Sequence, residues 1–229
     1  MLKKFNHLWK EIPKIKQKNG GENGRVYEIN QKTSYPSITT VLSKTSDKSS
    51  LVKWRKRVGE EQANKVTKAA TTRGTSMHKL CEDYLLNEPL DDLGSTSGEF
   101  LFRGIRPELD LIDNVRCLET PLYSNILKVA GTVDCIAEYK GKLSIIDFKT
   151  SNRTKKVEWI QDYFLQGCFY FIAYRELVGE MPEQVCILIS VQDGSKQIFT
   201  LSKKDIIKYT NQLKERITLY NGLTSNKTN

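Results

Sequence analysis

Two aspartates and a lysine stand out in a segment whose pattern predicts a β-hairpin, residues 131–150. If the Lys-Gly pair at 140–141 forms a two-residue turn, its glycine tolerates the positive φ that such a turn requires. Asp134 then lies directly opposite Asp147, with Cβ atoms about 4.5–5.5 Å apart. Lys149 lies on the same face as Asp147, because it is two residues further along an extended strand.

Opposed carboxylates repel each other, so this arrangement calls for a cation between them. A hard divalent cation is the natural candidate, since Mg²⁺ takes one or two carboxylates together with water and a substrate phosphate. Lys149 would add positive charge and could position or deprotonate an attacking water. The alternative is an ion cluster of structural value only, and a longer loop would shift the register and break the pairing.

Two more polar groups fall on predicted helices. His78 precedes Glu82 by four residues, so both lie on one helical face and Glu82 could accept the second ring N–H of a metal-bound histidine. The alternative for His78 is a structural role in a helix. Gln166 lies within a stripe of tyrosines, where a polar amide needs a partner such as the carboxylates, a water or a phosphate.

The wider pattern predicts an α/β fold with a mixed central sheet flanked by helices. Strands are expected at 25–29, 115–124, 127–139, 142–151, 184–192 and 197–201. Helices are expected after Pro36 with Ser37 as N-cap, and at 50–69, 72–86, 99–113, 158–177 and 203–221. We expect a flexible basic arm over residues 1–24, then one nuclease domain over 25–229 with a helical part (36–113), a catalytic sheet (114–202) and a C-terminal helix (203–221).

The order and spacing of these groups resemble the RecB-like exonuclease branch of the PD-(D/E)xK nuclease superfamily. Gly131-x-x-Asp134 followed by Asp147-x-Lys149 resembles its central motif. The flanking matches are Gly74-x-x-x-His78-x-x-x-Glu82 on the upstream helix, Glu119 on the preceding strand and Gln166-x-x-x-Tyr170 on the following helix. PSITTVL followed by LVKWRKRVGEE also resembles the mitochondrial genome-maintenance exonucleases and their phage relatives, so the resemblance covers roughly residues 35–192.

This resemblance implies a restriction-endonuclease-like core and metal-dependent cleavage of DNA. The implied metal is Mg²⁺ or Mn²⁺, and its ligands would be His78, Asp134, Asp147 and the backbone carbonyl of Phe148. Lys149 would serve the nucleophilic water, while Gln166 and Tyr170 would shape the site or contact the DNA. Glu119 is a further catalytic candidate whose role is less well defined.

The net charge of +9, from 36 Lys and Arg against 27 Asp and Glu, favours a polyanionic partner such as nucleic acid. Basic segments at 47–73 and 149–156 could follow phosphates, with Trp54 as a base-stacking platform. The residues expected to contact DNA are Trp54, Arg55, Arg57, Arg73, Ser151, Arg153 and Lys155. The alternative is a charged helix face in water, with Trp54 anchoring its helix.

Several classes of protein are disfavoured. The five cysteines are odd in number and contain no CxxC pair, so we expect no disulfide framework, zinc cage or iron–sulfur cluster, although some nucleases of the superfamily carry such a cluster. No apolar run approaches the ~18 residues of a membrane span. The N-terminus lacks a continuous apolar stretch, so we expect a protein that is not secreted and acts in the cytoplasm, that of the host cell if phage-encoded.

The resemblance therefore predicts an exonuclease that hydrolyses phosphodiester bonds from single-stranded DNA ends. Its expected setting is phage DNA replication, recombination, repair or degradation. Two alternatives stay open: a structure-selective endonuclease of the same superfamily, and a non-catalytic DNA-binding module with a degenerate site. The complete set of Asp134, Asp147 and Lys149 argues against the second alternative.

Overall fold

The computed structural model describes residues 3–21, 24–90 and 93–225. Its centre is a mixed sheet, as the sequence predicted, and the five strands lie in the order β4-β5-β6-β7-β8. The strands are β4 (Ile112–Ser124), β5 (Val129–Tyr139), β6 (Lys142–Ser151), β7 (Gln184–Val191) and β8 (Lys196–Leu201). Only β6 and β7 run parallel; the other neighbours are antiparallel. The chain between β6 and β7 must therefore cross over, and it carries a long helix.

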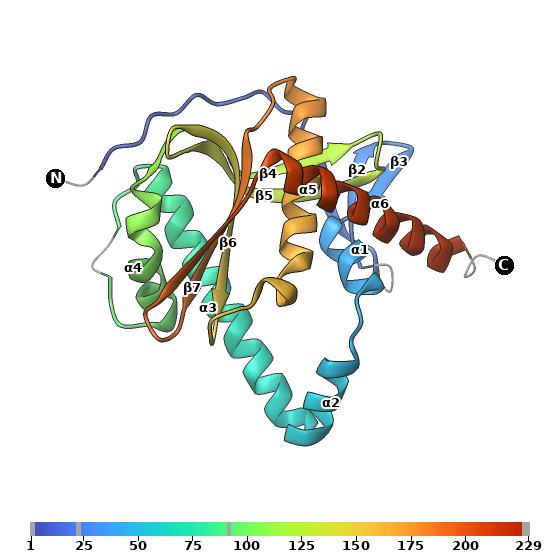
Figure 1. Cartoon of the computed structure of the whole chain (residues 1–229), viewed down its shortest axis with the longest axis horizontal. Helices are drawn as coiled ribbons and strands as arrows, with labels where there is room; N and C mark the ends of the chain where they lie inside the picture. Colours follow the sequence, from blue (N-terminus) through green and yellow to red (C-terminus); the bar gives the residue numbers. More distant parts are fainter. Residues whose placement is uncertain (1–2, 22–23, 91–92, 226–229) are drawn as a thin grey trace.

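Helices cover both faces of the sheet (Figure 1). On one face, α3 (Glu60–Leu85) and α4 (Ser97–Leu109) enclose one buried core. On the other, α1 (Ile38–Thr45), α5 (Gln161–Val178) and α6 (Lys203–Ser225) enclose a second. Residues of β7 are buried almost throughout, as expected for a strand covered on both faces. Among the described residues, none of the helices combines the length and the apolar character needed to cross a bilayer.

The sequence predicted two helices at 50–69 and 72–86, and the structure also has two helices here but with the break at another residue. The break falls at Gly59, whose φ of +84° ends α2 (Ser49–Val58) and starts the single long helix α3. Gly74 lies within α3 and does not interrupt it. No residue of α2 is buried, and α2 and the first half of α3 project beyond the sheet (Figure 1).

Part of the N-terminal segment expected as a flexible arm makes defined contacts with the domain. Phe5 is buried and its ring meets the edge of Tyr84 with centroids 5.1 Å apart. His7 forms a parallel bridge with Val115 at the start of β4. Further on, β1 (Lys16–Asn19) joins β2 (Arg25–Asn30) and β3 (Thr33–Pro36) in a small antiparallel sheet. The charge of this segment suggested that it is solvated. In the structure, the Phe5 ring and the backbone bridge between His7 and Val115 attach it to the domain.

Candidate active site

Three carboxylates lie in one row across three neighbouring strands. The β5–β6 ladder pairs Tyr139 with Lys142 and continues to Cys135 with Ile146, which is the predicted register and makes Asp134 and Asp147 the next opposed positions. The β4–β5 ladder passes from Leu118–Cys135 to Thr120–Val133, so its register places Glu119 opposite Asp134. Neither carboxylate pair belongs to its ladder.

The backbone is irregular along this row. Glu119 has a φ of +41°, in the left-handed region that non-glycine residues seldom adopt and that marks strain near functional sites. Val133 packs into the core on the α5 side and Cys135 into the core on the α3 side, so the alternation of faces shifts at Asp134. The Asp134 carboxylate accepts a hydrogen bond from the Phe148 N–H at 2.8 Å. Asp134 therefore lies where the strand shifts from one core to the other.

His78 reaches this row from α3. Its Nδ1 lies 3.7 Å from Asp134 Oδ2 and 3.9 Å from Glu119 Oε1. One ligand atom from each of these three residues can be chosen so that all lie within 4.8 Å of one another. Burial alone would lower the pKa of His78, but Asp134 and Glu119 outweigh it and raise that pKa.

Asp147 and Lys149 form a buried pair beside this group. Asp147 is fully buried, and its Oδ1 accepts a hydrogen bond from Lys149 Nζ at 2.6 Å. Burial, together with Asp134, raises the pKa of Asp147 although Lys149 opposes the shift. Burial lowers the pKa of Lys149, but Asp147 and Asp134 more than compensate and raise it. The lysine is therefore held as a cation by the carboxylates it faces.

The donor set fits a divalent metal. Asp147 Oδ2 is buried and lacks a hydrogen-bond partner although it also lies 2.6 Å from Lys149 Nζ. A buried carboxylate is costly unless cations or hydrogen-bond donors complete it. Carboxylates suit Mg²⁺ and Mn²⁺, and imidazole is an acceptable nitrogen ligand for transition metals such as Mn²⁺. The geometry thus groups Glu119 with His78 and Asp134, whereas Asp147, also predicted as a ligand, is paired with Lys149.

The role predicted for Glu82 is not the one the structure gives it. Its carboxylate lies 3.2 Å from Lys79 Nζ, and the carboxylates within 4 Å of the His78 ring among the described residues are those of Glu119 and Asp134. The His78 ring instead meets the Phe148 ring edge-on, with centroids 6.2 Å apart. Helical spacing predicted that the partner of His78 is Glu82 on the same helix. In the structure the His78 ring faces Glu119 and Asp134 on the sheet.

Gln166 and Tyr170 connect α5 to the strand that carries Asp134. The Tyr170 hydroxyl donates to the Thr132 carbonyl at 2.6 Å, and Gln166 Nε2 donates to that hydroxyl at 3.2 Å. Gly131 allows this approach, since an added Cβ would lie 3.0 Å from the Tyr170 hydroxyl and 2.9 Å from Ile38 Cγ2. Gln166 and Tyr170 therefore hold β5 in position from the α5 side of the sheet.

Tyr163 is one of the tyrosines in the stripe around Gln166, and the sequence alone did not mark it as a site residue. In the structure it is only partly buried, and Lys149 Nζ lies 5.2 Å from the centre of its ring. A cation over an aromatic face is attracted to it. The spacing i, i+3 to Gln166 was the available signal, because it places Tyr163 on the same helical face.

Comparison with known proteins finds exonucleases that are similar in sequence. The mitochondrial genome maintenance exonuclease 1 of Mus musculus is 34% identical over 180 residues, covering 72% of this chain and 52% of that protein. The corresponding human protein is 30% identical over 181 residues, with the same coverage. That of Xenopus tropicalis is 32% identical over 179 residues, covering 70% and 49%. The chain is therefore similar in sequence to these exonucleases over about 180 residues.

The chain spans about half the length of these curated relatives. No profile of a known protein family matches it. A crystal structure of a protein from Eubacterium rectale superposes with a TM-score of 0.46 at 14% identity, over 67% of this chain and 68% of that chain, which is too weak to define a shared fold.

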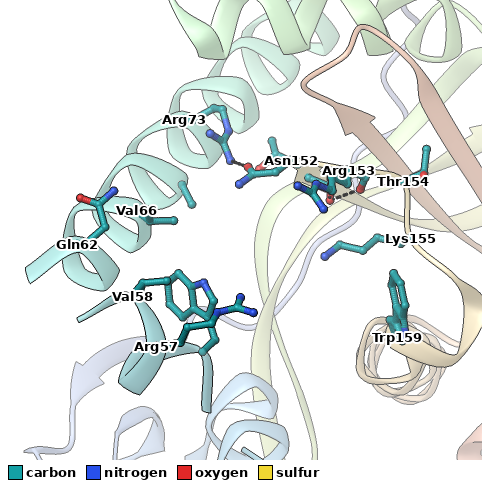
Figure 2. Close-up of a pocket in the computed structure, with 14 residues that line it drawn as sticks. Arg57, Val58, Gln62, Val66, Arg73, Asn152, Arg153, Thr154, Lys155 and Trp159 are labelled. Carbon is teal, nitrogen blue, oxygen red and sulfur yellow. Dashed lines mark hydrogen bonds between the residues drawn. The ribbon is translucent and has the colours of Figure 1, made fainter. Parts of the chain in front are cut away.

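A cleft of about 670 Å³ is lined by residues of two helices and by the end of β6 from Thr150 onward. One wall comes from α2 and α3, and the other from the loop after β6 and the short 3-10 helix η2 (Val157–Trp159). Figure 2 shows Arg57 and Arg73 on the helical side and Arg153 and Lys155 on the loop side. The predicted DNA-contacting residues that line it are Trp54, Arg57, Arg73, Ser151, Arg153 and Lys155.

Arg55 is the exception among the predicted DNA contacts. Its guanidinium pairs with Glu60 and hydrogen-bonds Asn64, and it is not part of the cleft wall. Residues two apart on a helix point in different directions, so Arg55 and Arg57 cannot share one surface. Trp159, which the sequence analysis did not single out, lines the cleft and is 64% exposed.

Proposed function

We propose that this chain is a divalent-metal-dependent DNA exonuclease that hydrolyses phosphodiester bonds from single-stranded ends. The observation that carries the proposal is the group of His78, Glu119 and Asp134 beside the buried Asp147–Lys149 pair. A basic cleft is lined from Thr150, the residue after Lys149 on β6. Similarity to proteins named as exonucleases over about 180 residues supports it. We further propose that residues 25–229 act as one nuclease domain, in phage DNA replication, recombination, repair or degradation.

His78, Glu119, Asp134 and Asp147 would hold the metal, Mg²⁺ or Mn²⁺, and the Phe148 carbonyl stays a candidate ligand. When bound, such a metal polarises the scissile phosphate and lowers the pKa of a bound water. Lys149 is kept protonated by Asp147 and Asp134, so it would orient the attacking water and stabilise the charge that develops on the phosphate. Asp147 and the Tyr163 ring restrict the position of its ammonium group.

The cleft beside the site would receive the DNA strand. Arg57, Arg73, Arg153 and Lys155 place cations on both of its walls, which is the pattern of a surface that binds phosphates without reading sequence. Since all five cysteines are free and buried, the chain suits a reducing compartment, and we propose the cytoplasm.

End-labelled linear single-stranded DNA, linear duplex and circular single-stranded DNA, each incubated with Mg²⁺, Mn²⁺ or EDTA, test the proposal. We expect shortening of the linear single strand with either metal, no cutting of the circle, and no reaction in EDTA. Cleavage of the circle would indicate an endonuclease instead. Tight binding with no cleavage of any substrate would indicate a DNA-binding module.

A further inference from the structure

Trp159 is one of the large apolar residues that the structure leaves exposed. Its side chain is 64% accessible, and Val157, two residues earlier on η2, is 47% accessible. Lys156 Nζ lies 5.5 Å from the centre of the Trp159 ring and restrains it by a cation–π contact. An indole held in place and left open to solvent offers a flat apolar surface to a ligand.

A second tryptophan lines the same cleft from the opposite wall. Trp54 lies on α2 and is partly buried, while Trp159 lies across from it on η2. Figure 2 shows the Trp159 side chain beside that of Lys155, with Arg57 on the facing wall. Cations that bind phosphates thus alternate with aromatic rings that bind flat groups. This combination is found where proteins hold single-stranded nucleic acid.

We propose that Trp159 is a base-stacking residue for unpaired nucleotides, with Trp54 as a second platform on the facing wall. The inference rests on the proposed function and specifies how the cleft distinguishes strands. In a duplex the base faces are covered by their neighbours, whereas an unpaired base offers its π-face to an indole. Arg57 and Lys155 would hold the backbone on either side, and the strand would lead to Thr150 and on to Lys149.

The test measures binding by fluorescence anisotropy in Ca²⁺, chosen to support binding without cleavage, with a labelled oligothymidylate and the same strand carrying abasic nucleotides. Trp159→Ala should weaken binding of the intact strand by about fivefold to 150-fold, the range for loss of one stacked base. The abasic strand should bind wild-type protein similarly weakly, and Trp159→Ala should weaken it little further. Trp159→Phe should restore most of the lost affinity.

Trp9→Ala is the matched control. Trp9 is also half-exposed but stacks on His7 in the N-terminal segment and does not line the cleft, so its removal should leave binding unchanged. The proposal is overturned if Trp159→Ala binds the intact strand like wild type, or if its loss is as large on abasic as on intact DNA. A protein that shows the expected coupling but never cleaves DNA would refute the proposed function alone.

Discussion

Asp147 and Lys149 set each other's charge, and this decides how Lys149 can act. A lysine among apolar groups tends toward a lower pKa, but here Asp147 and Asp134 raise it. The ammonium is therefore poor as a proton acceptor at neutral pH and suited to stabilising developing negative charge.

Replacing Lys149 by alanine should affect the chemical step more than DNA binding. We expect the single-turnover cleavage rate to fall by about 10²-fold or more, the usual loss for one preorganised transition-state contact. Affinity for DNA in Ca²⁺ should change by less than about tenfold. Strongly weakened binding with an intact rate would make Lys149 a phosphate clamp and refute this mechanism.

Two glutamates were candidates for the partner of His78. Helical spacing favours Glu82, whereas the structure places Glu119 3.9 Å from His78 Nδ1. Glu119→Gln removes a charge near the His78 ring, so the Mg²⁺ concentration needed for half-maximal cleavage should rise about 10–100-fold, as for loss of groups that support a metal site. Glu82→Gln should behave like wild type, since Glu82 pairs with Lys79. Equal effects of the two changes would contradict the placement of Glu119 in the site.

At the scale of elements, a buried acidic side chain joins α4 to the central sheet. Glu108 accepts a hydrogen bond from the Tyr139 hydroxyl at 2.5 Å on β5 and lies 2.7 Å from Lys196 Nζ on β8. Burial would raise the pKa of Glu108, but Lys196 and Tyr139 outweigh it and lower that pKa. A carboxyl whose folded pKa lies below its unfolded value stabilises the fold above the unfolded pKa.

Glu108→Gln should therefore lower the free energy of unfolding at neutral pH, by about 1.5–3 kcal/mol as for hydrogen bonds to a charged group. The difference from wild type should shrink as the pH falls below the ordinary glutamate value of 4.5 and through the lowered folded pKa. Urea unfolding from pH 7 down to pH 3 measures it. A difference independent of pH would mean that packing, and not the charge, explains the loss.

At the scale of the whole molecule, the net charge of +9 favours DNA binding, and the position of the cations decides which of them contact phosphates. For single strands, the slope of log K against log salt is about −0.7 per phosphate neutralised. Arg57→Ala with Lys155→Ala removes one cation from each wall of the cleft and should flatten that slope by about one to two units.

Arg55→Ala is the control for this measurement, because Arg55 is on the same helix as Arg57 but is already neutralised by Glu60. Its slope should stay close to that of wild type. If Arg55→Ala flattens the slope as much as the double variant, the strand follows the outer face of α2 and not the cleft.

The sequence by itself determined the register of the hairpin and the relation of Asp147 to Lys149. A two-residue turn fixes the register, and a period of two places Lys149 beside Asp147, so both follow from neighbours along the chain. The order of helices and strands was predictable for the same reason. The break at Gly59 was missed because a glycine signals a break only when its φ is known.

The tertiary structure alone decided which residues meet from different elements. Helical spacing paired His78 with Glu82, but the packing of α3 across the sheet brings it to Glu119. Trp159 faces the same cleft as Trp54 although the two lie far apart in the chain. Local patterns specify direction only within one element; distances between elements depend on how their apolar faces pack, and burial then sets the charge of Asp147 and Lys149.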